Sequence, residues 1–490
     1  MYFIGVDLGT SATKLLLMDE LGTIHKLVSR SYPLSMPRPG WSEQDPEAWI
    51  EAAFDGIREL TADVDPGLVR GIAAAGQMHG LVALDARDRV LRPAILWNDG
   101  RTGEETEWLN RAVGEEFLAA HTGNIAFAGF TAPKLLWMRK HEPELFARID
   151  KIMLPKDYLV YRLTGVHATD ASDASGTLLF DVAHRRWSGE MLEVCSLRET
   201  QMARVFESYE PVGTLKSDAA RALGLPGDVL VAAGAGDNAA AAVGTGTVGR
   251  GKCNISLGTS GTLFLSDDRY VEPENHALHA FCHADGGWHL LGCELSAASC
   301  LSWWAELTGH TDLAAEQAGI DRERLGRNRV FFLPYLMGER TPHNDAEAAG
   351  AFVGMRMDTS RADLTQAVLE GEAFGLRDGL EIARKAGMRV TASGLAGGGA
   401  KSPLWREILA NILDLELIAP ETEQGPGLGG AILAAVGCGV YPDVLAAVQA
   451  LVKPSGAGTT PDRTLTAKYN ERYDVYTSLY PALKAPFRAL

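Results

Sequence analysis

Cysteine and positive charge are both scarce in this chain of 490 residues. It has six cysteines and no CxxC pair, which excludes a disulfide framework and is typical of buried thiols in a reducing compartment. Lysine and arginine number 46 against 63 aspartates and glutamates, so the formal net charge is −17. Because such a surface repels a phosphate backbone, we expect no nucleic acid partner. A small phosphorylated ligand remains compatible with this charge, since backbone amides or a metal ion offset the field locally.

Long apolar runs are missing as well. The stretch 428–441 is apolar but glycine-rich and too short to span a bilayer. The first residues, MYFIGVDLGTS, have no basic region, and Asp7 interrupts their apolar run, which is unlike a signal peptide. We therefore expect a cytoplasmic protein with no membrane partner.

Short apolar runs alternate with amphipathic stretches along the chain. This alternation favours an α/β fold of layered sheets. A length of 490 residues is typical of two large domains or three smaller ones. We expect strands at 2–8, 13–18, 67–76 and 228–236, and helices at 44–60 and 237–244.

A four-residue motif, LGTS, occurs twice, at 8–11 and again at 257–260. Both copies follow an apolar run and precede another one. Although a single short match can arise by chance, a repeat at half the chain length predicts two related domains. We place them at residues 1–246 and 247–490, with the boundary in the glycine-rich stretch 244–252 and a closing, aromatic-bearing helix after about residue 450.

Each copy contains a Gly-Thr-Ser turn between two predicted strands. Backbone N–H groups and hydroxyls in such a turn suit phosphate oxygens, so the two turns predict a nucleotide held between the domains. The alternative is that each is simply a good hairpin turn. The predicted cofactor-binding residues here are Gly9, Thr10, Ser11, Gly258, Thr259 and Ser260.

Asp7 precedes the first turn directly, whereas Ser256 holds the matching place in the second copy. A carboxylate beside phosphates is repelled unless a cation lies between them. Asp7 therefore predicts Mg²⁺ bound through water, on one half of the site only. An aspartate that caps the turn is the alternative reading.

A second glycine-rich segment, GLAGGGAKSPLW at 394–405, resembles a strand end followed by a helix that carries Trp405. Bare backbone at Gly397, Gly398 and Gly399 would let a flat adenosine or ribose group lie against it. A triple glycine alone is weak evidence, because flexible loops contain it too.

Three further segments place polar groups at predicted strand ends, where α/β sheets bind ligands. Asp237 begins a predicted helix, either as an N-cap or as a carboxylate that deprotonates a hydroxyl in a cleft. Met78 and His79 in GQMHG, and Trp97 in WNDGR, follow apolar strands. Aromatic and imidazole groups of this kind suit a polyol.

Two glycine motifs and one histidine cluster are set aside. GTVGRGKC at 246–253 and GTGTVG at 244–249 resemble phosphate loops, but neither has the strand-to-helix context that such loops need. His276, His279, Cys282 and His283 belong to a segment that alternates like a strand, which would divide them between two faces. We expect core or sheet-surface residues there rather than a zinc site.

Together the motifs resemble the FGGY family of carbohydrate kinases, of the actin/hexokinase/Hsp70-type ATPase superfamily, over nearly the whole length. The matching segments are IGVDLGTS, WSEQDPEAW, GQMHG, LRPAILWNDGR, GFTAPKLLW, LPKDYL, GDNAAAAVG, SLGTSG, FLPYLMGERTPH and GLAGGGAKS. GQMHG with WNDGR points to xylulose rather than glycerol as the acceptor. One departure is 425–436, where glycines replace a more alanine-rich run.

This resemblance implies two RNase H-like domains around an interdomain cleft that binds ATP, Mg²⁺ and a sugar. It implies transfer of phosphate from ATP to the C5 hydroxyl of D-xylulose, with Asp237 as catalytic base and Asp7 as the essential metal-side aspartate. Met78, His79 and Asn238 would contact the sugar. The loop of Gly397, Gly398, Gly399, Ala400 and Lys401 would bind adenosine, and a homodimer is the family-based expectation.

Three alternatives stay open. The first is a kinase for another acceptor on the same scaffold, such as L-ribulose, gluconate or 1-deoxy-D-xylulose. The second is a chaperone-type ATPase, for which the roughly 40 residues after 450 are too few to form a peptide-binding domain. The third is a sugar-sensing repressor, which would need a basic DNA-binding domain.

Overall fold

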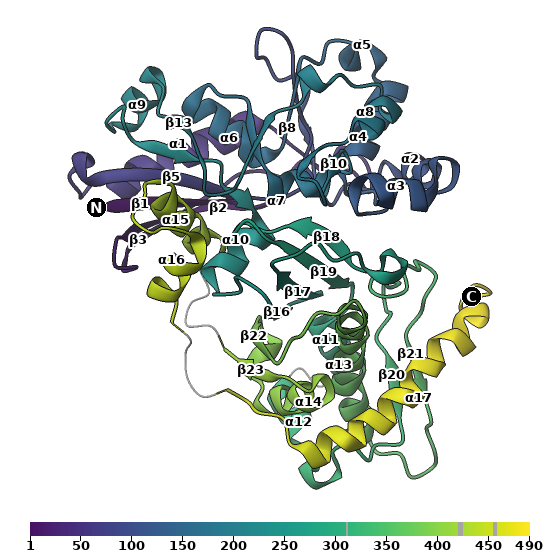
Figure 1. Cartoon of the computed structure of the whole chain (residues 1–490). Helices are drawn as coiled ribbons and strands as arrows, with labels where there is room; N and C mark the ends of the chain where they lie inside the picture. The colour runs from purple at the N-terminus through teal and green to yellow at the C-terminus, as the bar shows by residue number, and fades with distance from the viewer. Residues whose placement is uncertain (310–311, 420–424, 454–457) are drawn as a thin grey trace.

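The computed structural model describes residues 1–309, 312–419, 425–453 and 458–490. Two large mixed sheets, one built from each half of the chain, dominate the architecture (Figure 1). Helices cover the sheets, and the chain ends in a long helix along the outside of the C-terminal half. Among the described residues, no helix combines the length and apolar character needed to cross a membrane.

The N-terminal sheet has the strand order β13-β14-β5-β1-β2-β3, and β15 also pairs with β5. Its hairpin β1–β2 and strand β3 are antiparallel, whereas β5 and β14 continue it in parallel. The bounds are β1 Tyr2–Leu8, β2 Ala12–Asp19, β3 Ile24–Ser31, β5 Val69–Gly76, β13 Pro211–Thr214, β14 Leu230–Ala232 and β15 Ala235–Gly236.

The C-terminal sheet repeats this topology. Its order is β18-β19-β17-β16-β22-β23: β16–β17–β19 run antiparallel, and β22 and β23 continue β16 in parallel. The bounds are β16 Lys252–Leu257, β17 Gly261–Asp267, β18 His279–Cys282, β19 Trp288–Glu294, β22 Ala392–Ala396 and β23 Glu416–Ile418. The LGTS motifs therefore lie in equivalent hairpins of two related sheets, as the repeat predicts.

The helices and short strands fill the remaining chain. The helices are α1 Pro46–Thr61, α2 Gly103–Trp108, α3 Glu115–Thr122, α4 Thr131–His141, α5 Pro143–Phe146, α6 Pro155–Thr164, α7 Ala171–Ala174, α8 Gly189–Val194, α9 Ser217–Leu223, α10 Asp237–Gly244, α11 Ala298–Leu307, α12 Leu313–Ala318, α13 Arg361–Lys385, α14 Pro403–Leu413, α15 Gly425–Gly437, α16 Val444–Leu451 and α17 Arg463–Phe487. The short strands are β4 Glu43–Gln44, β6 Val82–Leu84, β7 Ala94–Ile95, β8 Lys151–Met153, β9 Ala168–Asp170, β10 Phe180–Asp181, β11 Arg186–Trp187, β12 Arg204–Phe206, β20 Phe331–Leu333 and β21 Ala351–Val353.

The helix α10 lies between the two sheets. Its residues Ala240 and Val243 belong to an apolar cluster with the N-terminal sheet. On another side, Ala242 belongs to a cluster that includes Phe264 and Phe281 of the C-terminal sheet. Small alanine side chains allow this close packing on both sides, and the first residue of the helix, Asp237, is thereby held between the two halves.

The helix α15 comes late in the sequence but packs on the N-terminal sheet, and α16 packs on α15 and α10 (Figure 1). The carbonyl of Gly427 lies so close to Gly5 of β1 that a β-carbon at Gly5 could not be accommodated. Gly429 approaches the backbone of Ala240 in the same way. The glycines at 425–436 therefore serve close backbone packing. The division at residues 246 and 247 remains a proposal, and this packing argues for assigning 425–451 to the N-terminal unit.

Most predicted elements are found close to their expected positions. The strand at 2–8 and the helix at 237–244 are confirmed with the same bounds, and α17 is the expected closing helix. The single strand expected at 228–236 is wrong, because β14 and β15 are separated there. Gly234 has a φ of 78° and lies against the carbonyl of Ala74, which bends the chain between the two strands.

Candidate active site

Three strand ends meet at one edge of the N-terminal sheet. In the parallel ladders, Leu8 of β1 pairs with Gly76 of β5, and Gly76 pairs in turn with Gly236 of β15. The segments that follow these three residues therefore emerge side by side. They are the first Gly-Thr-Ser turn, Gln77–His79 and the start of α10.

The first turn is tied to the neighbouring segments through Thr10. The indole Nε1 of Trp97 donates to the Thr10 hydroxyl at 2.9 Å, and that hydroxyl donates to Gln77 Oε1 at 3.2 Å. Gln44 Nε2 donates to the Thr10 carbonyl at 2.7 Å. Trp97 is 48% exposed, so part of its surface is available to a ligand. Gln44 and Gln77 are not among the predicted site residues, although they lie in the WSEQDPEAW and GQMHG motifs.

Asp7 is the last residue but one of β1 and is partly buried. Burial raises the pKa of its carboxyl to about 6, and the nearby Lys14 ammonium opposes the shift. If Asp7 capped the turn, its carboxylate would accept a hydrogen bond from the turn. Among the described residues, Thr13 instead donates to the backbone carbonyl of Asp7 and not to its side chain. A lone, partly buried carboxylate fits a magnesium ion that keeps most of its water ligands.

Asp237 is the first residue of α10, and Gly236 occupies the N-cap position. Its Oδ1 accepts hydrogen bonds from the backbone N and the Nδ2 of Asn238 at 2.8 and 3.0 Å, and that Nδ2 lies 3.9 Å from the sulfur of Met78. Burial, together with the negative charge of Asp7, raises the pKa of Asp237 to about 7. The structure thus brings together Asp7, Met78, Asp237 and Asn238.

His79 is held as a neutral ring. Its Nδ1 lies 2.7 Å from the carbonyl oxygen of Gly176, and its ring stacks on Phe130 with centroids 4.7 Å apart. Burial lowers the pKa of His79 to about 3. Because a carbonyl can only accept, Nδ1 carries the proton and Nε2 is left as an acceptor, which suits a sugar hydroxyl.

The backbone of His79 has a φ of 68°, which is unusual for a residue with a β-carbon. Two side chains of α4 stabilise this conformation: Lys134 Nζ and Thr131 Oγ1 both donate to the His79 carbonyl, at 2.7 and 3.0 Å. Lys134 is fully buried, and burial holds its pKa well below the usual range. A lysine inside the apolar stretch GFTAPKLLW was the available signal for this role.

The second turn joins the C-terminal sheet to α11. Leu257 and Gly261 pair across the hairpin, and the turn carbonyls point toward the start of α11. The backbone N of Ala297 donates to the Thr259 carbonyl and that of Ala298 to the Gly258 carbonyl, both at 2.9 Å. Thr259 and Ser260 themselves are exposed and available to a ligand.

A cavity of about 610 Å³ opens beside this turn, between α11, α12 and α14. The predicted residues Gly398, Gly399 and Lys401 line it, whereas Gly397 and Ala400 do not. Gly397 has a φ of 92° and packs against the backbone of Leu257, so it shapes the loop rather than the cavity wall. The parallel pairing of Ser256 with Ala396 explains why this loop lies next to the second turn.

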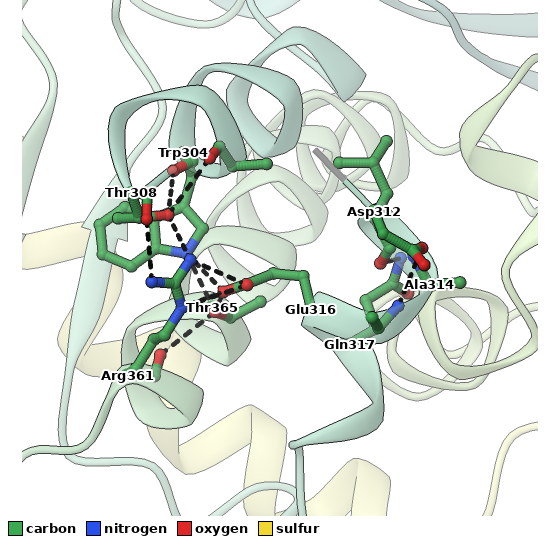
Figure 2. A network of polar contacts seen from close by, with 11 residues as sticks. Trp304, Thr308, Asp312, Ala314, Glu316, Gln317, Arg361 and Thr365 are labelled. Atoms are coloured by element: carbon green, nitrogen blue, oxygen red, sulfur yellow. Dashed lines mark hydrogen bonds and ion pairs between the residues drawn. The ribbon is translucent and has the colours of Figure 1, made fainter. Parts of the chain in front are cut away.

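The helix α12 forms one wall of this cavity, and none of its residues was among those predicted. Figure 2 shows the carboxylate of Glu316 pointing toward Trp304, Arg361 and Thr365. Thr365 Oγ1 donates to it at 2.6 Å, and Arg361 donates through Nε and Nη2. This network fixes α12 to α11 and α13, while the adjacent Gln317 lines the cavity and accepts a hydrogen bond from Ser402. No residue pattern in the sequence marks this arrangement.

The predicted residues therefore form two groups. One lies at the edge of the N-terminal sheet and contains the first turn, Asp7, Met78, His79, Trp97, Asp237 and Asn238; the other contains the second turn and the 397–401 loop. Within the described ranges, no hydrogen bond joins the two groups. Nor do the described residues contain a group of three or more His, Cys, Asp or Glu side chains arranged to hold a metal. His279 and Cys282 are buried on β18, and His283 is buried just after it.

Comparison with known proteins identifies the class to which this fold and site belong. Residues 2–244 match the N-terminal domain, and residues 253–438 the C-terminal domain, of the FGGY family of carbohydrate kinases. The chain belongs to this family and is a phosphotransferase with the two-domain, actin/hexokinase-like fold. It is 42% identical over 483 residues to a xylulose kinase of Escherichia coli K12, which covers 98% of this chain and 99% of that protein.

Solved structures agree with this assignment. A crystal structure described as a xyloylose kinase from Brucella ovis superposes with a TM-score of 0.93 at 42% identity, over 99% of this chain and 100% of that one. A gluconate kinase from Lactobacillus acidophilus also reaches a TM-score of 0.93, at 26% identity and over 100% and 99% of the two chains. The scaffold is therefore shared by kinases that are named for different acceptors.

Proposed function

We propose that this enzyme transfers the γ-phosphoryl group of ATP to the C5 hydroxyl of D-xylulose, giving D-xylulose 5-phosphate and ADP. One observation carries the proposal: Asp237, His79 and the first turn lie at the same edge of the N-terminal sheet, and the pKa of Asp237 is near 7. The names of the relatives that are 42% identical support xylulose as the acceptor.

In this mechanism Asp237 accepts the proton of the C5 hydroxyl while the hydroxyl oxygen forms a bond to the γ-phosphorus. The bond between the γ-phosphorus and the oxygen that bridges to the β-phosphate breaks, and ADP leaves. A base whose pKa lies near neutral pH is well matched to this proton transfer. His79, through Nε2, and Trp97, through its exposed ring, would hold the sugar, and Asn238 would orient Asp237.

The nucleotide would lie with its adenosine in the cavity beside Gly398 and Gly399 and its phosphates against the two turns. A magnesium ion near Asp7 would neutralise charge on the phosphates. Backbone amides of the turns then position the phosphoryl group, and positioning with charge stabilisation is the main source of catalysis in phosphoryl transfer.

ADP release in the presence of Mg-ATP tests the proposal, measured against D-xylulose, L-ribulose, glycerol, gluconate and 1-deoxy-D-xylulose. Strong stimulation by D-xylulose alone is expected. Asp237→Asn should lose at least ~10²-fold in kcat, as expected for a general base. Normal turnover by this variant would overturn the assignment of the base.

A second acceptor is a specific alternative, because a gluconate kinase shares the fold at a TM-score of 0.93. Stimulation by gluconate or L-ribulose in the same assay would keep the kinase and replace the acceptor.

We also propose a cytoplasmic homodimer, on the family likeness alone. Light scattering after size-exclusion chromatography distinguishes a dimer of about 105 kDa from a monomer of 52.6 kDa.

A further inference from the structure

A fully buried segment outside the proposed catalytic set, residues 170–176, lies beneath the sugar site. It begins at Asp170, the last residue of β9, and runs through α7 to Gly176. The side chains of Asp170, Ser172 and Asp173 are 0% exposed. Polar side chains are kept in such positions only when they have partners or a role.

A chain of hydrogen bonds leads from this segment to the catalytic strand. Ser172 Oγ donates to Asp170 Oδ2 at 2.5 Å and accepts from the backbone N of Gly236 at 3.1 Å. Because the hydroxyl proton is committed to the carboxylate, a lone pair of Ser172 faces the Gly236 N–H. Gly236 immediately precedes Asp237, so this hydroxyl holds the peptide from which the base projects.

Lys156 keeps the far end of the chain charged. Its Nζ lies 2.8 Å from Asp170 Oδ1 and 2.6 Å from Asp157 Oδ1, and it is 0% exposed. The aliphatic part of the Lys156 side chain packs on Gly76, the last residue of β5. A β-carbon added at Gly76 would lie 2.8 Å from the β-carbon of Lys156. A hydrogen bond to an ionised acceptor is stronger than one to a neutral acceptor. The ion pair with Lys156 therefore strengthens the hydrogen bond between Ser172 and Asp170.

The other end of the segment reaches the sugar-binding side. The carbonyl of Gly176 accepts the hydrogen bond of His79 Nδ1 at 2.7 Å. Next to it, Ser175 Oγ accepts from the backbone N of Cys282 in the C-terminal sheet at 3.0 Å. One rigid, buried segment thus contacts the strand of the base, the ring that would bind the sugar, and the opposite sheet.

We propose that Asp170 and Ser172 are positioning residues for Asp237. By fixing the peptide of Gly236 on the same segment that fixes His79, they set the separation between the base and the bound sugar hydroxyl. This inference rests on the proposed role of Asp237. The competing explanation is that the buried charges around Lys156 only stabilise the fold.

Ser208 provides a matched control. Its hydroxyl donates to the same Asp170 Oδ2 at 2.7 Å and is equally buried, but within the described residues its side chain makes no bond to β15. Both Ser172→Ala and Ser208→Ala should lower the melting temperature, since each removes one donor from Asp170, and Ser172→Ala should lower it more because it also leaves the Gly236 N–H without its acceptor. Only Ser172→Ala should lower kcat, by about 10- to 100-fold, with the KM for ATP unchanged. Equal kcat in the two variants would overturn the inference.

A double-variant comparison separates this inference from the proposed function. If Ser172 acts through Asp237, adding Ser172→Ala to Asp237→Asn should change the residual kcat by less than about twofold. A full additional loss would overturn the inference. If Asp237→Asn itself keeps normal turnover, the proposed base fails. If Asp237→Asn is inactive while Ser172→Ala matches Ser208→Ala, only the positioning role fails.

Should Ser172→Ala fold poorly, Ser172→Cys fills the site with a somewhat larger side chain and keeps a weak S–H donor. It should fold and lose about 10-fold in kcat, while Ser208→Cys stays within about twofold of the parent. Equal kcat in this pair of variants would again contradict the positioning role. Ser172→Thr, which retains the hydroxyl, should recover most of the lost rate.

Discussion

Replacement of Gly176 by alanine should weaken sugar binding by displacing His79. The added β-carbon would lie under 3.0 Å from Nδ1 and Cε1 of the imidazole, a separation that real β-carbons essentially never show, and 3.2 Å from Cε of Met78. Gly176 does not have a positive φ, so the backbone itself tolerates alanine. The strain therefore falls on the His79 ring, whose backbone carbonyl is held by Lys134 and whose face stacks on Phe130.

Relief of this contact requires a shift of about 1 Å, and misplacements of that size cost up to ~10²-fold in enzymes. The shift also breaks the hydrogen bond between His79 Nδ1 and Gly176, which fixes the ring tautomer. We expect kcat/KM for D-xylulose to fall by about 10- to 100-fold, mostly through KM, because uniform loss of binding raises KM. The KM for ATP should stay within about twofold, since the proposed nucleotide cavity is lined by a different part of the chain.

Initial rates of ADP formation, with each substrate varied in turn, measure these constants. Gly189→Ala is the matched control, because a β-carbon there would meet no atom within 4 Å. A Gly176→Ala variant with an unchanged KM for the sugar and a normal melting temperature would refute the assignment of His79 as a sugar-binding residue.

Three further predictions concern ionisable groups. The pKa of Asp237, raised to about 7, means that roughly 10% of the base is ionised at pH 6 and roughly 90% at pH 8; kcat/KM for the sugar should rise about tenfold between them, and a flat profile would contradict its role as base. Asp7→Asn should lower kcat by at least ~10²-fold and raise the Mg²⁺ concentration needed for half-maximal rate; an unchanged Mg²⁺ titration would remove Asp7 from the metal side. Burial raises the pKa of Glu372 well above its usual range, so the contribution of this carboxyl to the free energy of unfolding is fully present at low pH and is lost as the pH rises. Glu372→Gln should therefore raise the melting temperature more at pH 8 than at pH 5. Equal changes at both pH values would argue against a buried neutral carboxyl.

The duplicated sheets were predictable because the repeat marks a local event. The LGTS motif closes a hairpin, and a hairpin depends on neighbouring residues. Once β1 and β5 are recognised as parallel strands, their carboxyl ends must share an edge, and this brings Asp7 near the segment that contains His79. Asp237 follows by the same logic, since β15 also pairs with β5.

The contacts that the sequence did not reveal all join segments far apart in the chain. The return of α15 to the N-terminal sheet depends on backbone contacts of Gly427 and Gly429 with residues of β1 and α10. The carbonyl of His79 is held by Lys134, which is 55 residues away, and Gly236 is held by Ser172 across 64 residues. Hydropathy periodicity describes which face of an element is buried but not which partner buries it.

The two related hairpins carry out different tasks, and one substitution between them explains the difference. In the first copy, Asp7 places a carboxylate beside the turn, and its charge helps to raise the pKa of Asp237. In the second copy, Ser256 is uncharged, and the turn carbonyls accept hydrogen bonds from the start of α11, a wall of the nucleotide-sized cavity. In the proposed arrangement, a second carboxylate at this place would repel the phosphates of the nucleotide without the water-bound cation that Asp7 is suited to hold. In the proposed mechanism, duplication of one hairpin would thus give a cation-binding side and a neutral, nucleotide-binding side, and Asp7 would be on the side of the proposed base and sugar contacts.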